Sequence, residues 1–102
     1  MTAKEKEPTP IGCFKDLWKR DLRNFLGYDL TIEECIIKGK EINDIYVGLQ
    51  HGNECWADST IGGYGKADDN DCKMPCSRDH SKFCGGPYRN LVFDLRDLHR
   101  GS

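Results

Sequence analysis

Six cysteines in a chain of 102 residues constrain this fold more than any other feature of the sequence. An even number of cysteines in so short a chain is typical of a disulfide framework, which indicates an oxidising compartment. They are Cys13, Cys35, Cys55, Cys72, Cys76 and Cys84. A domain of this size buries only about two-thirds of its unfolded surface, so cross-links would add stability that a small core lacks. The spacing alone leaves the pairing open.

The composition excludes several classes of function. A net charge of -2, from 15 basic and 17 acidic residues, offers no bulk attraction for phosphate backbones, so we expect no nucleic-acid partner. No apolar run reaches about 18 residues, so we expect no membrane span. Residues 1–10 are polar and contain no signal peptide. We therefore expect a secreted or cell-surface protein whose signal is missing from this sequence.

The chain divides into three regions. We expect a disordered lead-in over residues 1–10, one folded domain over 11–95 and a polar tail over 96–102. Within the domain, the apolar run at 11–14 can begin a strand. Charged residues and a glycine interrupt the apolar pattern over 15–30, which predicts a mixed loop with a short turn or helix.

A helix is the clearest local prediction. Thr31 and Glu34 have the spacing of a capping box, in which a hydroxyl and a carboxylate satisfy free amides at the start of a helix. Apolar or small residues follow at helical spacing, which predicts an amphipathic helix of about ten residues that ends near Glu41. A helix this short is marginal alone, so packing or a bond at Cys35 must hold it.

Strands and a long loop complete the domain. Residues 45–50 are rich in β-forming residues, and a turn at 51–53 returns the chain to a second strand over 54–57. Glycines and acidic residues over 58–71 indicate a loop, and a last strand is predicted over 90–95. This order of elements predicts a small α+β domain.

The residues around the cysteines resemble the WSC domain, a cysteine-rich extracellular module related in fold to the PAN/apple group. The matching segments are Gly12-Cys13-Phe14-Lys15-Asp16, Thr31-Ile32-Glu33-Glu34-Cys35, Tyr46-Val47-Gly48-Leu49-Gln50, Gly52-Asn53-Glu54-Cys55-Trp56, Tyr64-Gly65-Lys66-Ala67, Asp71-Cys72-Lys73-Met74-Pro75-Cys76-Ser77 and Cys84-Gly85-Gly86-Pro87-Tyr88-Arg89-Asn90. They cover about 11–95. The resemblance implies a curved antiparallel sheet packed on one short helix, which agrees with the elements predicted above.

The resemblance also implies a disulfide pairing. The bonds carried over from the family are Cys13–Cys72, Cys35–Cys55 and Cys76–Cys84. WSC domains usually carry a further pair of cysteines, and its two positions fall here at Gly39 and Ala57. Because both are absent together, no unpaired thiol is expected. We expect Trp56 or Ile36 to fill the space left by that bridge, and we expect the domain to be softest there.

Metal binding is the main alternative for the clustered cysteines. Cys72, Cys76, His80 and Cys84 could form a Cys3His zinc site, but Pro75 argues against a continuous helix and three other cysteines would be unexplained. The acidic run at 68–71 could supply calcium ligands, yet it lacks the spaced carboxylates and distal glutamate of an EF-hand. We therefore favour disulfides and expect no metal and no cofactor.

Catalysis has little support in the sequence. His51, His80 and His99 lie in turn-like or tail segments, and no hydrolase or metalloprotease motif occurs. Glu33 and Glu34 are helix neighbours that face different directions, which suits capping better than paired acid and base roles. We expect that the protein is not an enzyme.

Aromatic residues are the stronger lead to a binding site. Sugar rings stack their apolar faces on aromatic planes, while their hydroxyls bind amide, carboxylate and guanidinium groups. The candidate ligand-binding residues are Tyr46, Asn53, Glu54, Trp56, Asp58, Tyr64, Tyr88, Arg89 and Asn90. Tyr64 and Tyr88 lie in glycine- or proline-rich loops and are expected to be exposed, Phe83 is expected to be buried, and Trp56 is as consistent with the core as with a platform.

Three functions remain open at this point. The resemblance implies a non-catalytic module that recognises polysaccharide, since WSC domains occur in fungal wall-stress sensors, glycan-active enzymes and animal receptors. A protein-interaction or spacer module, whose aromatic residues belong to the core, is the main alternative. A secreted defence or matrix protein that binds microbial walls is the third. We expect a monomer in each case.

Overall fold

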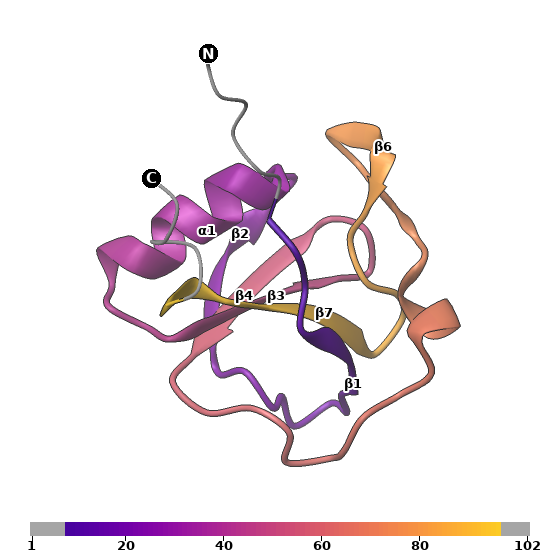
Figure 1. Ribbon diagram of the computed structural model, residues 1–102, viewed down its shortest axis with the longest axis horizontal. Helices are drawn as coiled ribbons and strands as arrows, with labels where there is room; N and C mark the ends of the chain where they lie inside the picture. The colour runs from indigo at the N-terminus through magenta and orange to yellow at the C-terminus, as the bar shows by residue number, and fades with distance from the viewer. Residues whose placement is uncertain (1–7, 97–102) are drawn as a thin grey trace.

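The computed structural model describes residues 8–96, which form one five-stranded antiparallel sheet with a helix packed on one face (Figure 1). The strand order is β1-β7-β3-β4-β2. The elements are β1 (Gly12–Lys15), β2 (Asn24–Tyr28), α1 (Ile32–Glu41), β3 (Tyr46–Gln50), β4 (Glu54–Asp58), the 3-10 helix η1 (Asp69–Cys72), β5 (Pro75–Cys76), β6 (Asp79–Phe83) and β7 (Arg89–Asp94). This confirms the predicted α+β class. The predictions for residues 1–7 and 97–102, His99 included, lie outside the described residues.

Helix α1 has the predicted start and end. The Thr31 hydroxyl accepts from the backbone N–H of Glu34 at 3.0 Å, and the Glu34 carboxylate accepts from the backbone N–H of Thr31 at 2.9 Å, which completes the capping box. The hydrogen bond from the Thr31 backbone N–H lowers the pKa of the Glu34 carboxyl. Neither helix of the described part has the length and apolar character that crossing a bilayer requires.

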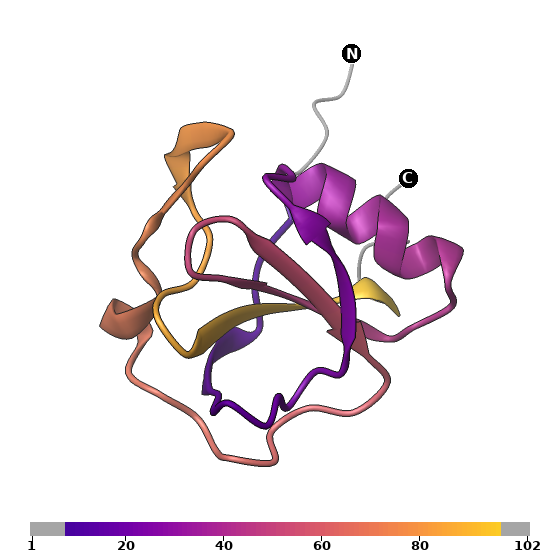
Figure 2. The ribbon, with the colours of Figure 1, turned by 180° about the vertical axis from the view of Figure 1, so that it is seen from behind.

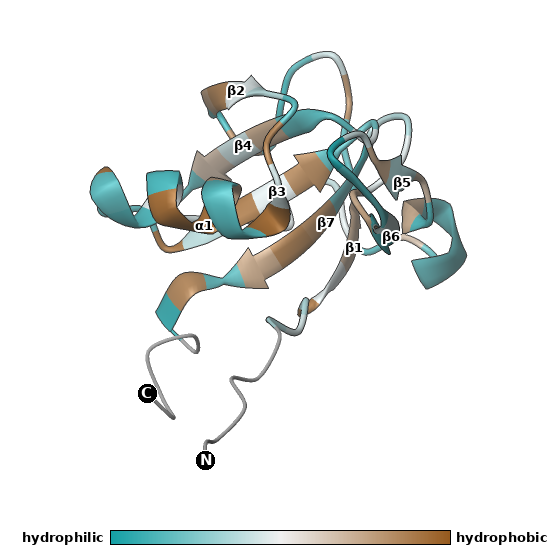
Figure 3. Cartoon of the chain, turned by 90° about the horizontal axis from the view of Figure 1, so that it is seen from above, coloured by the Kyte–Doolittle hydropathy of each residue, from teal (hydrophilic) through white to brown (hydrophobic). Residues whose placement is uncertain are grey.

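The core lies between α1 and the sheet (Figure 3). Alternate residues of the three central strands face the helix, because successive side chains of a strand point to opposite sides. Val47, Leu49 and Phe93 are among these buried side chains, with Leu95 just beyond the end of β7. The opposite face of the sheet is therefore free to carry the remaining side chains of β3, β4 and β7.

Two loops cover part of that opposite face. Residues 16–23 and 59–67 lie together at the end of the molecule away from α1 (Figures 1 and 2). The Tyr64 hydroxyl donates to the Lys19 carbonyl at 2.5 Å and joins the two loops. Leu22 is buried against Gly48, where an added Cβ would lie 2.5 Å from the Leu22 Cδ1 atom. Glycine at this position allows the first loop to approach the sheet closely.

Strand β2 contradicts the predicted mixed loop over 15–30. It pairs antiparallel with β4 and forms an outer edge of the sheet (Figure 2). A β-bulge between Phe25 and Gly27 inserts one extra residue, and Gly27 has a φ of 145°, in the region that favours glycine. The bulge breaks the alternation that identifies a strand, which explains why the sequence pattern missed it. The β5–β6 hairpin was also not predicted.

All six cysteines form disulfides, in the pairs that the resemblance implies. Cys13 joins Cys72, Cys35 joins Cys55 and Cys76 joins Cys84. The second bond links α1 to β4 beneath it. Because Cys72, Cys76 and Cys84 are all in disulfide bonds, the cysteines of the zinc alternative are not available as thiolate ligands.

The space of the absent fourth bridge is filled by two side chains that were not expected there. A Cβ added at Gly39 would lie 2.4 Å from the Val47 Cγ1 atom and 3.0 Å from the Leu95 Cδ1 atom. Trp56 lies on the other face of the sheet from its buried neighbour Ala57, so the prediction that Trp56 fills this space is wrong. Val47 and Leu95 pack against the helix backbone at Gly39 instead.

Candidate functional site

A row of aromatic side chains crosses the sheet face opposite α1. The row contains Tyr28, Phe25, Trp56 and Tyr88, with the guanidinium of Arg20 between the last two rings. Ring centroids lie 4.8 Å apart for Tyr28 and Phe25, and 5.0 Å apart for Phe25 and Trp56. Tyr28, Phe25 and Tyr88 are 61%, 42% and 46% exposed, and Trp56 is half-buried. This aromatic row is therefore accessible along its length.

The bulge in β2 brings the first two rings of the row together. Phe25 pairs with Trp56, and Tyr28 pairs with Glu54 two residues away on β4. Residues two apart on one strand share a face, so Phe25 and Tyr28 both point to the side of the Trp56 ring. Phe25 and Tyr28 are three positions apart along the chain. In a regular strand, residues at that spacing would face opposite sides.

Arg20 contacts the last two rings of the row, those of Trp56 and Tyr88. Its guanidinium carbon lies 5.0 Å from the centroid of the Trp56 ring and 5.0 Å from that of the Tyr88 ring, which is cation–π distance for both. Its Nη1 atom donates to the Gln50 side chain at 3.0 Å and to the Asp16 carboxylate at 3.3 Å. Arg20 therefore links two surface rings to a buried polar network.

That network lies directly beneath the row. Asp16, Gln50 and Asn90 are all buried. The Gln50 amide donates to the Asp16 carboxylate at 2.9 Å and to the Asn90 side-chain oxygen at 3.2 Å. The backbone N–H of Asp21 also donates to Asp16, at 2.8 Å. Hydrogen bonds to a buried carboxylate fix its position, so the network holds Arg20 in one orientation.

Three of the predicted site residues belong to this surface. Trp56 and Tyr88 are members of the aromatic row, and Glu54 lies beside it. The indole N–H of Trp56 donates to the Glu54 carboxylate at 3.0 Å, which orients both side chains. Ligand binding by these residues stays a prediction, but the structure does bring them together on one face.

Four other predicted residues lie apart from the row or are engaged elsewhere. The Tyr46 ring is at the far end of β3, where it lies 5.6 Å from the Arg96 guanidinium and its hydroxyl accepts from Arg96. The Tyr64 hydroxyl joins the two loops, as described above. Arg89 pairs with Asp71 at 3.1 Å. Asn53 is half-buried in the turn between β3 and β4. Binding by these four residues also stays a prediction.

Two of the predicted ligand-binding residues, Asp58 and Asn90, are buried and hydrogen-bond within the protein. Both carboxylate oxygens of Asp58 accept hydrogen bonds from Arg23, at 2.8 and 3.2 Å, and one accepts from the backbone N–H of Ser59 at 2.7 Å. These bonds hold the pKa of the Asp58 carboxyl below its usual range. Asn90 is buried under Gln50. Neither side chain lies on the surface, so we leave both out of the proposed binding residues.

Phe83 contradicts its predicted burial. It is 45% exposed, because β6 stands away from the main sheet (Figure 1). The Lys73 ammonium lies 5.3 Å from the centroid of its ring. The neighbouring Cys84 is fully buried, so proximity to a buried cysteine was a poor guide to the position of Phe83.

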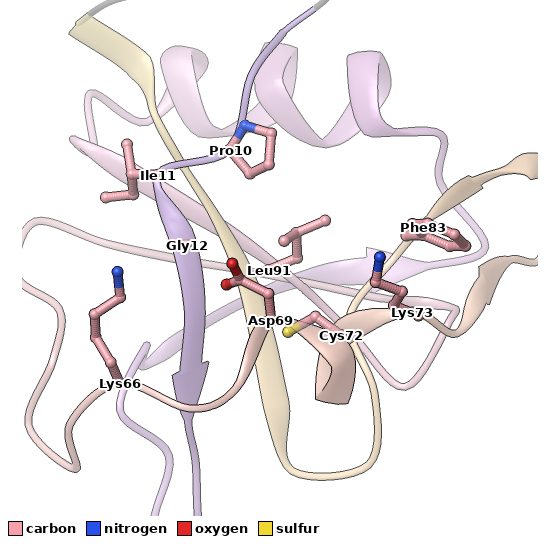
Figure 4. Close-up of a pocket in the computed structure, with 9 residues that line it drawn as sticks. All are labelled: Pro10, Ile11, Gly12, Lys66, Asp69, Cys72, Lys73, Phe83 and Leu91. Carbon is pink, nitrogen blue, oxygen red and sulfur yellow. The ribbon is translucent and has the colours of Figure 1, made fainter.

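A shallow hollow lies beside Phe83, away from the aromatic row. It has a volume of about 290 Å³ and is lined by Pro10, Ile11, Gly12, Lys66, Asp69, Cys72, Lys73, Phe83 and Leu91 (Figure 4). Lys66 and Lys73 lie on opposite sides, with Asp69 between them (Figure 4). A second hollow of about 220 Å³ shares Pro10, Phe83 and Leu91 and continues toward the start of α1. Together they form an open groove with an apolar floor.

Sequence reasoning missed Phe25 and Tyr28 because it missed β2, and it also missed Arg20. The available signal was the pair of aromatic residues on either side of Gly27, since a glycine inside a strand often marks a bulge. The position of Arg20 depends on a contact between a loop and the sheet, which local periodicity does not report.

The fold and its surface define a small disulfide-stapled α+β module with an exposed aromatic face. A family model described as the WSC domain matches residues 10–86. This match covers most of the chain, and the chain belongs to the WSC domain family.

Two relatives illustrate how widely the domain occurs. The chain is 30% identical over 90 residues to a "WSC domain-containing protein" of Arthroderma benhamiae, covering 79% of this chain and 10% of that protein. It is 28% identical over 92 residues to "Kremen protein 1" of Homo sapiens, covering 85% of this chain and 20% of that protein. The chain therefore spans a small part of the length of these relatives.

Proposed function

We propose that this domain is a non-catalytic extracellular module that recognises polysaccharide through the aromatic row. The observation that carries this proposal is the exposed row from Tyr28 to Tyr88, in which three rings are in contact and the Arg20 guanidinium links the third, Trp56, to Tyr88. Apolar faces of sugar rings stack on such planes, and a row accommodates several units of a chain. The Glu54 carboxylate beside the Trp56 ring is placed to accept hydrogen bonds from sugar hydroxyls.

Rigidity of the row favours binding. Arg20 and the buried polar network hold Trp56 and Tyr88 in place before a ligand arrives, so little side-chain freedom remains to be lost. An extracellular location is supported by the three disulfides, which form and persist in oxidising compartments, and by membership of the WSC family.

A titration with cell-wall and matrix polysaccharides tests the proposal. We expect chemical-shift changes at the backbone amides of residues 25–28, 54–56 and 88, together with a change in Trp56 fluorescence. Tyr28→Ala removes an exposed ring of the row and should weaken binding by about fivefold or more, equivalent to about 1 kcal/mol of stacking energy. Because Tyr28 is exposed, the fold should be unchanged.

Trp18→Ala is the matched control, since Trp18 is also highly exposed but makes no ring contact with the described members of the row. It should leave glycan affinity unchanged. If no polysaccharide in a broad collection perturbs the row, or if both substitutions weaken binding equally, recognition by the aromatic row is wrong.

The groove beside Phe83 favours protein interaction as the second candidate. Its apolar floor and flanking lysines suit an extended peptide segment. Phe83→Ser would then weaken binding of a protein partner, whereas Tyr28→Ala would not. Comparing these two variants in the same binding assay separates the groove from the aromatic row.

A further inference from the structure

The tip of the 16–23 loop exposes two adjacent apolar side chains. Trp18 is 81% exposed and Leu17 is 50% exposed. Trp18 has the largest exposed fraction of any large hydrophobic residue in the described part of the chain. Neither hollow described above is lined by a residue of this loop.

The charges of this loop are segregated. Its two acidic residues both accept hydrogen bonds from the protein: Asp16 is buried in the polar network, and the half-buried Asp21 carboxylate accepts from the backbone N–H groups of Gly62 and Gly63 at 2.9 and 3.0 Å. Lys15 and Lys19, on either side of the apolar pair, are exposed and form no ion pair with another described residue. The outer surface of the loop is therefore apolar and positively charged, although the whole chain carries a net charge of -2.

The loop is also held in one conformation. Leu22 is anchored in the interior, the Lys19 carbonyl accepts from Tyr64, and Arg20 is fixed between two rings. Leu17 and Trp18 therefore belong to a loop that these contacts tie to the rest of the fold. Ordering this loop costs little further entropy when the tip meets a partner.

We propose that this tip docks the domain on a lipid bilayer whose outer leaflet carries anionic headgroups. Tryptophan partitions to the interface between headgroups and acyl chains, leucine adds apolar contact, and flanking lysines pair with anionic headgroups while their stems lie along the apolar zone. A fluid interface accommodates exposed apolar side chains without a complementary pocket, which a protein partner would have to supply. Since Trp18 lies outside the aromatic row, this docking is independent of glycan recognition.

Vesicle binding tests the docking directly. Vesicles of equimolar phosphatidylcholine and phosphatidylserine should sediment the domain, and vesicles of phosphatidylcholine alone should bind it far more weakly. Lys15→Gln with Lys19→Gln should weaken binding by about fivefold for each lysine, and added salt should weaken it further. Leu17→Ala with Trp18→Ala should abolish measurable binding. Both double variants change exposed side chains, and circular dichroism checks that they fold.

Fluorescence locates the contact, because the chain has two tryptophans. Trp56→Phe leaves Trp18 as the reporter, and its emission should shift to the blue on binding vesicles. Trp18→Phe is the matched control, in which an apolar ring remains at the tip and the emission of Trp56 should not change. Failure to bind the anionic vesicles, or binding that persists in the Leu17→Ala, Trp18→Ala variant, would overturn the proposal. Binding of heparin without binding of vesicles would also overturn it and would assign the lysines to a soluble polyanion.

Discussion

Arg20 is the residue on which the candidate surface depends most. It touches two rings of the aromatic row and hydrogen-bonds to Gln50 and Asp16 below them. Arg20→Ala should destabilise the domain by about 1–3 kcal/mol, because the buried Asp16 carboxylate loses a charged donor. The same change should alter Trp56 emission without any ligand.

Arg20→Lys is the informative control for this prediction. It keeps the positive charge but loses the planar group that stacks on both rings. Urea denaturation and fluorescence of the two variants should therefore rank wild type, Arg20→Lys and Arg20→Ala in that order. Equal stability of wild type and Arg20→Ala would show that Arg20 is not needed to hold the network.

Asp58 is one of the carboxyls that make the stability of the fold depend on pH in the acid range. Its pKa is lowered chiefly by hydrogen bonds from Arg23, so its carboxylate stabilises the fold above its ordinary pKa of about 4 and loses that effect as the pH falls through the lowered value. Asp58→Asn should therefore be less stable than wild type at neutral pH. Urea midpoints across the acid range should show this difference narrowing below about pH 4. A constant difference would contradict the prediction.

At the scale of elements, the contact between α1 and β3 replaces a cross-link. Alanine usually favours a helix by about 1 kcal/mol over glycine. At Gly39 the added Cβ would meet the Val47 Cγ1 atom at 2.4 Å, so overpacking should outweigh that gain and Gly39→Ala should destabilise the domain by about 1–2 kcal/mol. In a Val47→Ala background the same substitution should be neutral or stabilising. A thermal-denaturation double-mutant cycle measures this coupling.

The elements also show what the sequence could and could not reveal. Helix α1 was predictable because its capping box is local, and the β3–β4 hairpin because its residues and turn are both characteristic. Strand β2 was not predictable, since its bulge interrupts the alternation of apolar and polar residues that identifies a strand. The same limit applied to the site: Trp56 and Tyr88 stood out as aromatic residues, but their link through Arg20 arises only when a loop folds over the sheet.

At the scale of the whole molecule, the disulfides differ in the length of chain that they close. The Cys13–Cys72 bond spans 59 residues, whereas the Cys76–Cys84 bond spans 8. In the chain-entropy model, replacing the first pair by alanine should cost about 2 kcal/mol more than replacing the second. All four cysteines are buried, so the two double variants are well matched. Urea denaturation of both measures the difference, and a smaller loss for the longer loop would contradict the model here.

The bulge in β2 also affects the tendency of the domain to associate with itself. An outer strand with an uninterrupted row of free backbone groups can template pairing with a second molecule and so promote aggregation. The extra residue at the bulge is Leu26, which packs against the core while Phe25 and Tyr28 both stay outside. Deleting Leu26 would leave those two rings on one face but would straighten the edge. The bulge therefore allows the domain to expose aromatic rings on an outer strand and also makes that strand less able to pair with a second molecule.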